Sequence, residues 1–368
     1  MKGLILSGGA GTRLRPITHT SAKQLVPVAN KPILFYGLEH MVEAGIREFG
    51  IVVGDTAEEI KAVVGDGSRW GVEITYIQQD EPLGLGHCVL ISRDFLGDDD
   101  FIMYLGDNMI QQGVARFVER FEAERRRANE PTLDGDHRMP AAQILLCPVP
   151  DPQRFGVAEV DAQGHVIRLI EKPADPPSNL ALAGVYLFTP AIHEAVSSIE
   201  PSARGELEIT DAIQWLIDHD QRVLHEVLEG WWLDTGKKDP LLESNRRVLE
   251  TVEQRLDGKI DEASQVDGRV VIEEGAELVG STVRGPAVIG ARTRLVNSYV
   301  GPFTAVANDC EVVDSEVEHS VVLEHSRIIG VPRLTDSLIG RHVEIIRSGQ
   351  RPRSTRVMVG DHCTIDLE

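Results

Sequence analysis

The chain has 368 residues, of which 42% are hydrophobic and 26% charged, as in ordinary globular proteins. Its formal net charge of −21 repels polyanions, which argues against a nucleic acid or an anionic membrane surface as a partner. No apolar stretch approaches the length of a membrane span, and the run Leu4–Leu6 is too short for a signal peptide, so we expect a cytoplasmic protein.

The first predicted element is a short strand at Leu4–Leu6 that leads into the glycine-rich segment Ser7–Arg13. Glycines let the backbone turn tightly and point its N–H groups at an anion. Arg13 can bind two phosphate oxygens at once, and Lys23 adds a point charge. The spacing matches neither the P-loop nor the dinucleotide fingerprint, and four glycine-turn residues alone fit a plain strand–helix connection equally well.

Residues up to about 238 alternate between short apolar runs and segments of helical periodicity. The predicted strands include Phe49–Val53, Val72–Ile77 and Phe101–Leu105, and the predicted helices include 33–44 and 114–126. This alternation predicts an α/β fold with a mostly parallel sheet and helices on both faces. In such sheets ligands bind beyond the carboxyl ends of the strands, where the glycine-rich turn falls.

Three further segments complete this part of the chain. Residues 127–140 lack periodicity and are predicted to form a loop, whereas 157–160 and 166–169 flank a turn and predict a β-hairpin. Leucines and valines at helical spacing among charges predict an amphipathic linking helix over about 239–257.

From about residue 260 the chain repeats every 17 residues. Three apolar rows keep this step, at Val266, Val283, Val300, Val317 and Leu334, at Ile272, Ile289, Val306 and Leu323, and at Leu278, Leu295, Val312 and Ile329. Internal steps of six, six and five residues give each unit three short apolar edges, which is typical of a three-sided parallel β-helix. The repeat weakens after about residue 335, as expected for a terminal cap.

Two aspartates are candidate metal ligands. Asp107 directly follows a predicted buried strand, and Asp234 stands beside a flexible glycine segment in Trp231–Gly236. Two such carboxylates can hold Mg²⁺ against phosphate oxygens, although each aspartate alone fits a turn or capping role.

Other polar residues suit a nucleotide and a sugar phosphate. The Gln79 amide offers a donor and an acceptor that match the edge of thymine or uracil. Glu171 can accept from sugar hydroxyls, while Lys172 and Arg204 can bind phosphate. Taken alone, each of these fits an ordinary turn residue or a solvated charge.

The extended string Gly8-Gly9-Ala10-Gly11-Thr12-Arg13, followed by Pro16 and Lys23-Gln24, resembles the sugar-nucleotide pyrophosphorylases, specifically the long-type glucose-1-phosphate thymidylyltransferases. The resemblance extends over essentially the whole chain. It implies a Rossmann-like nucleotidyltransferase domain at 1–238, a linking helix at 239–259 and a left-handed parallel β-helix at 260–368. We also expect a homo-oligomer. The flat faces of the β-helix suit self-association, and the alternative is that this domain packs back on the catalytic domain.

The resemblance also assigns roles. It implies catalytic roles for Arg13, Lys23, Asp107 and Lys172, and metal binding by Asp107 and Asp234. The implied nucleotide-binding residues are Leu6, Gly8, Gly9, Gly11, Thr12, Arg13, Gln24, Gln79, Pro82, Gly84 and Leu85. The implied sugar-phosphate-binding residues are Asp107, Gly156, Glu171, Lys172, Leu182, Gly184, Arg204 and Trp232. Phe155 departs from the family, which commonly has tyrosine there, and this leaves the choice of sugar open.

The implied reaction joins dTTP to α-D-glucose 1-phosphate with the help of Mg²⁺, giving dTDP-glucose and pyrophosphate. Alternatives remain at this point: UTP or another sugar 1-phosphate as substrate, or a regulatory or scaffold subunit that binds nucleotide sugars without turnover. Parallel β-helices also occur in acyltransferases, but the histidines at 319, 325, 342 and 362 have no accompanying motif.

Overall fold

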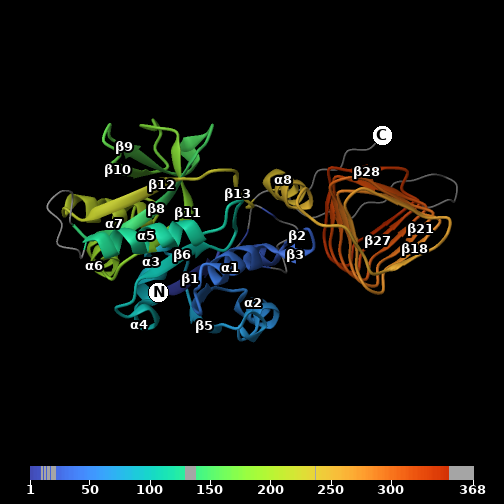
Figure 1. The fold of residues 1–368 in the computed structure, drawn as a ribbon, viewed down its shortest axis with the longest axis horizontal. Coiled ribbons are helices and arrows are strands. Elements are labelled where there is room, and N and C mark those ends of the chain that lie inside the picture. Colours follow the sequence, from blue (N-terminus) through green and yellow to red (C-terminus); the bar gives the residue numbers. More distant parts are fainter. Residues whose placement is uncertain are drawn as a thin grey trace. The chain divides into compact units, whose positions relative to one another are not determined.

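The structure is a computed structural model that describes residues 1–9, 11, 14, 17, 22–128, 138–236 and 238–347. The chain divides into two compact units (Figure 1). The first comprises Met1–Ala10 with Leu34–Leu233, and the second comprises Gly11–Ile33 with Asp234–Glu368. The division into domains at 238 and 259 expected from the sequence remains a prediction.

The first unit is built on one mixed sheet in the order β10-β9-β11-β6-β1-β4-β5, to which β8 and β12 are joined through β11. Its strands are β1 (Lys2–Ser7), β4 (Glu48–Val53), β5 (Glu73–Gln78), β6 (Phe101–Leu105), β8 (Pro140–Pro148), β9 (Gly156–Val160), β10 (Val166–Glu171), β11 (Leu180–Phe188) and β12 (Arg222–Val227). Four of them, β6, β1, β4 and β5, pair in parallel, so their carboxyl ends lie at one edge. The predicted parallel sheet is therefore confirmed.

Helices cover both faces of this sheet because successive strand residues point to opposite sides. Met103 packs in a core cluster with Val89 of α3 and Ile213 of α7, whereas the neighbouring Tyr104 ring lies against Gly37 of α1. The helices of this unit are α1 (Ile33–Glu43), α2 (Ala57–Val64), α3 (Leu85–Ile91), α4 (Arg93–Leu96), α5 (Ala115–Ala128), α6 (Ala191–Ser198) and α7 (Ile209–Asp218), with single 3₁₀ turns η4 (Ser68–Trp70) and η5 (Pro152–Arg154).

The predicted hairpin forms as β9 and β10, which pair antiparallel from Gly156 opposite Glu171 to Val160 opposite Val166. Two short strands, β7 (Asn108–Ile110) and β13 (Trp232–Asp234), also pair with each other. The predicted loop at 127–140 lies mainly in residues 129–137, outside the described residues.

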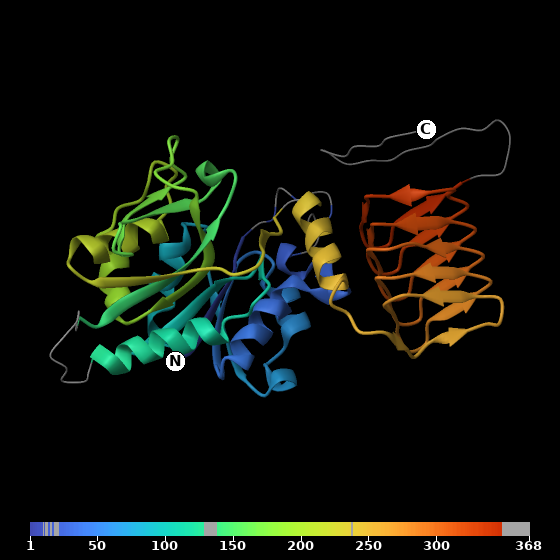
Figure 2. The same cartoon turned by 45° about the horizontal axis from the view of Figure 1, so that its top comes forward.

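The second unit contains a parallel β-helix with three stacked faces (Figure 2). Face D consists of β14 (Arg255–Leu256), β17 (Val270–Ile272), β20 (Ala287–Ile289), β23 (Thr304–Val306), β26 (Val321–Val322) and β29 (Leu338–Ile339). Face E consists of β15 (Lys259–Ile260), β18 (Glu277–Val279), β21 (Arg294–Val296), β24 (Glu311–Val313), β27 (Arg327–Ile329) and β30 (Glu344–Ile346). Face F consists of β16 (Gln265–Asp267), β19 (Thr282–Arg284), β22 (Tyr299–Val300), β25 (Glu316–Glu318) and β28 (Leu334–Thr335).

The sequence repeat predicts most of the inward-facing residues, but it is wrong by one residue in the fourth coil. Val306 pairs with Val322 rather than Leu323, and Val312 pairs with Ile328 rather than Ile329. The corner after Val317 is shorter than the Gly-Pro corners of the two preceding coils, so the strands that follow come one residue earlier. The coils continue through Ile346, within the predicted β-helix segment and past the point near residue 335 where the sequence repeat weakens.

The linking helix α8 (Lys238–Leu249) is shorter than predicted, and β14 and β15 begin the β-helix before residue 260. The outward row of face D is buried at Val288, Ala305 and Val321. Leu242 of α8 packs against Val321 and Leu323 there, with Ile17 and Leu338 at the same cluster. An amphipathic helix and an apolar outward row thus bury each other.

A hairpin from the N-terminal segment joins the same unit. After the turn η3 (Lys23–Leu25), β2 (Pro27–Val28) pairs with β3 (Lys31–Pro32) through a turn at Ala29 and Asn30, both with positive φ. The buried Asn245 of α8 accepts from the Ala29 N–H at 2.9 Å and donates to the Phe303 carbonyl at 3.0 Å. Asn30 donates to the Val306 carbonyl at 2.8 Å. The hairpin is therefore held by α8 and by the β-helix.

Candidate active site

Three of the predicted substrate residues follow three parallel strands of the first unit. Gly8 comes after β1, Gln79 after β5 and Asp107 after β6. Because these strands are parallel, their carboxyl ends share one edge of the sheet, where ligands of open α/β sheets bind. The fold therefore places these three predicted positions at a single edge.

Gly8 and Gln79 are in direct contact at this edge. A Cβ on Gly8 would lie 2.6 Å from Gln79 Oε1, so no larger residue fits without moving that amide. Gln79 is 6% exposed, and its Nε2 lies 3.1 Å from His87 Nδ1 and 3.2 Å from Cys88 Sγ at the start of α3. Burial raises the pKa of the Cys88 thiol to about 12, so this neighbour stays uncharged. The amide is thus held in a fixed orientation by α3.

The turn that follows Gln79 is joined to the segment before α7. Gly84 has φ +101°, and a Cβ there would lie 2.6 Å from the Leu207 carbonyl oxygen. The Leu207 N–H donates to the Leu83 carbonyl at 2.7 Å, and the Gly86 N–H donates to the Leu207 carbonyl at 2.8 Å. Only glycine allows this close approach, whereas the neighbouring Pro82 is exposed and Leu85 half-buried.

The remaining predicted nucleotide-binding residues are only partly described. Thr12 and Arg13 lie outside the described residues, while Gly9 is exposed and Leu6 is buried in β1. Gly11 adopts the left-handed conformation, with φ +61°. Gln24 of η3 is 1% exposed and Lys23 is half-buried, both in the second unit.

Two of the predicted sugar-binding residues, Trp232 and Gly184, contact Asn108, a residue that the sequence did not single out for this role. Its Oδ1 accepts from Trp232 Nε1 at 3.2 Å, and the Trp232 ring packs edge to face with Phe155 at 5.0 Å between centroids. Gly184 has φ +71°, and a Cβ there would overlap Asn108 Nδ2. The signal for Asn108 was its place beside Asp107 at a strand end.

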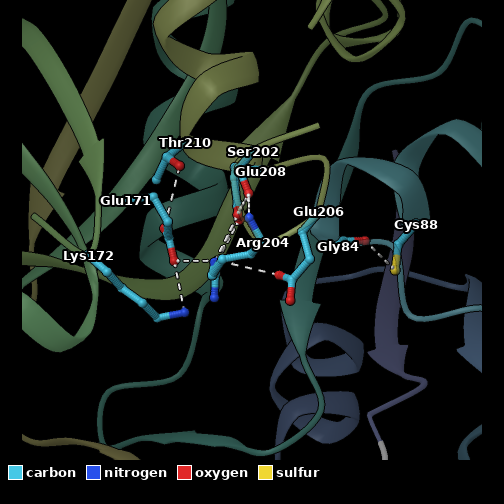
Figure 3. Close-up of polar contacts among 9 residues, drawn as sticks. All are labelled: Gly84, Cys88, Glu171, Lys172, Ser202, Arg204, Glu206, Glu208 and Thr210. Atoms are coloured by element: carbon cyan, nitrogen blue, oxygen red, sulfur yellow. Dashed lines mark hydrogen bonds and ion pairs between the residues drawn. The ribbon is translucent and has the colours of Figure 1, made fainter. Parts of the chain in front are cut away.

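A second group of predicted residues forms a network of charges (Figure 3). Glu171 Oε1 lies 3.2 Å from Lys172 Nζ and 3.2 Å from an Arg204 Nη atom. Arg204 also binds both oxygens of the buried Glu208 at 2.8 Å, and Glu206 lies 3.4 Å away. Arg204, predicted to bind phosphate, therefore already bridges three carboxylates, whereas the Lys172 side chain is 45% exposed.

This network is attached to the β9–β10 hairpin. Thr210 Oγ1 lies 3.4 Å from Glu171 Oε2. A Cβ on Gly156 would lie 2.6 Å from Thr210 Cγ2, 2.9 Å from Leu182 Cδ1 and 3.1 Å from Glu171 Oε2. Gly156, Leu182 and Glu171 were all predicted as sugar-phosphate-binding residues, and the structure brings these three together.

The two predicted metal ligands belong to different units, and each follows a strand. Asp107 comes after β6 and Gly106 in the first unit. Asp234 ends β13 in the second unit, and its Oδ1 accepts from the Gly236 N–H at 3.0 Å. Within the described residues, no group of three or more histidines, cysteines or acidic residues could hold a metal ion. Two carboxylates completed by substrate phosphates and water are a donor set that Mg²⁺ accepts.

In the part of the chain that the structure describes, no helix combines the length and the apolar character needed to cross a membrane.

Comparison with known proteins identifies the family. Residues 2–251 match the nucleotidyl transferase family. The chain is 60% identical over 362 residues to a glucose-1-phosphate thymidylyltransferase of Streptomyces griseus, covering 98% of both chains. It is 54% identical over 368 residues to the enzyme of that name from Streptomyces antibioticus, covering 100% of both.

A solved structure agrees with this. A structure described as a putative glucose-1-phosphate thymidylyltransferase from Bacillus anthracis in complex with a sucrose superposes with a TM-score of 0.61 at 32% identity. The match covers 70% of this chain and 98% of that one. The chain therefore belongs to the nucleotidyl transferase family and, within it, to the glucose-1-phosphate thymidylyltransferases.

Proposed function

We propose that this protein joins dTTP to α-D-glucose 1-phosphate and releases dTDP-glucose and pyrophosphate. The observation that carries the proposal is the placement of Gly8, Gln79 and Asp107 after three parallel strands whose carboxyl ends share one edge. The names of the full-length relatives supply the substrate pair.

In this proposal an oxygen of the sugar phosphate attacks the α-phosphorus of the nucleotide. A new P–O bond forms as the bond to the β-phosphate bridging oxygen breaks, and pyrophosphate leaves with that electron pair. Both reactants are anions, so the residues act by alignment and charge neutralisation rather than through a covalent intermediate.

Each group of residues has a part in this reaction. Arg13, Lys23 and the backbone of the glycine-rich turn would hold the triphosphate, while Gln79 would face the base. Lys172 would hold the phosphate of the sugar phosphate, and Glu171, Asn108 and Trp232 would shape the sugar site. Asp107 and Asp234 would hold Mg²⁺, which when bound neutralises charge on the phosphates.

Arg204 has a supporting part in this proposal. It would position Glu171 and Glu208, because its guanidinium already binds them.

The sequence left open a subunit that binds nucleotide sugars without turnover. Such a protein would bind the nucleotide but release no pyrophosphate. We further propose cytoplasmic localisation, since the described cysteines Cys88, Cys147 and Cys310 are buried and free, as is usual in a reducing compartment.

The substrate test measures pyrophosphate release with each of the five common nucleoside triphosphates and glucose 1-phosphate. We expect turnover that is fastest with dTTP and that stops when EDTA removes the divalent ion. Preference for UTP would contradict the nucleotide assignment, and binding without turnover with every nucleotide would contradict the enzyme assignment.

The residue test uses Asp107→Asn and Lys172→Ala in the same assay. We expect losses of roughly 10²–10³-fold in kcat/KM, the range seen when a preorganised electrostatic partner is removed. Lys61→Ala is the control, because Lys61 lies exposed on α2, where it pairs with Glu58 at 2.9 Å. Near-normal turnover of Asp107→Asn would refute its role.

A further inference from the structure

The side-chain amide of Gln79 has all its hydrogen-bond partners at one end. Its Nε2 lies 3.1 Å from His87 Nδ1 and 3.2 Å from Cys88 Sγ, both in α3. Among the described residues, no hydrogen bond reaches its Oε1, although only 6% of Gln79 is exposed. The oxygen lies against the glycine-rich turn, because a Cβ on Gly8 would be 2.6 Å from it. A buried amide therefore keeps one open acceptor.

The contact with His87 determines the state of the imidazole. An amide nitrogen carries two N–H donors and no acceptor, so the ring nitrogen that it meets has to accept. Nδ1 is therefore unprotonated, and the ring is the neutral tautomer with its proton on Nε2. If the amide were turned over, Oε1 would meet the lone pair of Nδ1. The ring and the amide thus orient each other.

The contact with Cys88 takes up the second N–H of the amide. The Cys88 thiol donates to the Gly84 carbonyl at 3.5 Å (Figure 3), so the sulfur lone pairs remain for Gln79 Nε2. Burial raises the pKa of this thiol to about 12, so the proton stays on the sulfur. Both N–H groups of Gln79 therefore have partners on α3.

We propose that His87 is a positioning residue that makes Gln79 present only a hydrogen-bond acceptor to the nucleotide base. The sequence suggests that this amide offers a donor and an acceptor, whereas the structure leaves the acceptor alone. The base then has to supply an N–H group, which thymine and uracil carry at N3 and cytosine lacks. This inference rests on the proposed function in one respect, that Gln79 faces the base.

The fixed amide discriminates between bases by leaving a wrong base unsatisfied. A cytosine ring would set its N3 lone pair against Oε1, and the buried oxygen would lose its partner. Turning the amide over would remove that conflict but would break the contacts with His87 and Cys88. His87 therefore acts on base specificity through Gln79, without a contact of its own to the substrate.

Calorimetric binding of dTTP and of 5-methyl-dCTP to the full chain with Mg²⁺ tests the proposal. The two nucleotides share the 5-methyl group and the deoxyribose and differ only at N3 and C4 of the base. Glucose 1-phosphate is left out, so that no transfer follows binding. We expect the wild type to bind dTTP roughly 10–100-fold more tightly, the effect of one buried acceptor without a partner.

The variants at position 87 test the positioning role. His87→Leu and the smaller His87→Ala should each lower the preference to about 5-fold or less, because the amide can then turn and present Nε2 to cytosine N3. His87→Asn should restore most of the preference, since its Oδ1 takes the place of Nδ1 and accepts the same N–H. His219→Leu is the matched control, because His219 lies exposed after the end of α7. A purely structural role would weaken the binding of both nucleotides alike.

The outcomes separate this inference from the proposed reaction. Three results would each overturn the positioning role: a wild type that binds both nucleotides equally, folded His87→Leu and His87→Ala variants that keep the full preference, or a His87→Asn variant as permissive as His87→Leu. Circular dichroism confirms that each variant is folded. Pyrophosphate release from dTTP and glucose 1-phosphate is measured alongside. A wild type that discriminates in binding but releases no pyrophosphate would refute the reaction and still support the role of His87.

Discussion

Gly184 illustrates how much the site depends on single backbone conformations. Its φ of +71° is one that L residues rarely adopt, and a Cβ would overlap the Asn108 amide that binds Trp232. A side chain at this position would therefore meet both steric overlap and backbone strain. At most other described glycines with positive φ, an added Cβ would meet backbone strain alone.

Gly184→Ala is predicted to lower the free energy of unfolding by about 3 kcal/mol and to raise KM for the sugar phosphate. Urea unfolding and steady-state kinetics measure the two effects. Gly45→Ala is the matched control, because Gly45 has φ +90° but nothing lies within 4 Å of its added Cβ. Its cost should be about 1 kcal/mol with unchanged kinetics. If both substitutions lower the free energy of unfolding by the same amount, the Asn108 side chain moves aside at no cost and the predicted effect of the overlap is wrong.

At the scale of single elements, α8 is held by a charge cluster on its surface. Glu243 Oε1 lies 2.7 Å from an Arg246 Nη atom and 2.6 Å from Arg247 Nε. The hydrogen bonds from Arg246, and then those from Arg247, lower the pKa of Glu243 to about 2 against the opposing effect of burial. A carboxyl whose pKa is depressed by folding stabilises the folded state above its unfolded pKa of about 4.3.

Glu243→Gln is therefore predicted to destabilise the protein by about 0.5–1 kcal/mol at pH 7, since solvent screens this partly exposed cluster. The difference from the wild type should shrink as the pH falls from about 5 towards 2, because the unfolded chain then binds a proton that the folded chain resists. Urea unfolding at several pH values measures this. A difference that stays constant with pH would contradict the assignment, and Glu250→Gln, at the edge of the same cluster, should show a smaller effect.

The β-helix shows at the same scale what a periodic pattern can and cannot predict. The 17-residue repeat correctly gave the inward residues of the first three coils because each coil must bury the same three edges. It was wrong at Leu323 and Ile329 because each directly follows another aliphatic residue, Val322 or Ile328, which is the one that points inward after the shortened corner. In a run such as Val321-Val322-Leu323, composition alone leaves the register undecided.

At the scale of the whole molecule, Asn245 connects segments that are far apart in sequence. It is fully buried and joins the Ala29 N–H to the Phe303 carbonyl, so the hairpin after η3 is fixed to the β-helix unit. Lys23 and Gln24 of the predicted nucleotide site lie just before this hairpin. The β-helix thus supports the segment that carries them.

Asn245→Ala is predicted to leave two partly buried backbone groups without these hydrogen bonds, at a cost of about 1–3 kcal/mol. Because the hairpin then loosens, KM for the nucleotide should rise more than kcat falls. Thermal unfolding and kinetics with varied nucleotide test this, with Asn297→Ala as control, since Asn297 is exposed and its amide donates to Asp314 at 2.6 Å. An unchanged KM in a destabilised Asn245→Ala protein would limit Asn245 to a structural role.

The sequence by itself determined the α/β architecture, the β9–β10 hairpin and the β-helix, because each depends on a local period of apolar residues or on a turn. It also indicated residues for the site, since Gly8, Gln79 and Asp107 follow predicted strands. Whether those residues carry the proposed chemistry remains a prediction.

Only the tertiary structure decided which side chains meet. Asn108 beside Gly184, Arg204 among three carboxylates and Asn245 between the hairpin and Phe303 all join residues that are distant in the chain. The periodicity of apolar residues predicts which side of a segment faces the core. Contacts between distant residues depend instead on the register of strands and coils, and no local sequence pattern encodes that register.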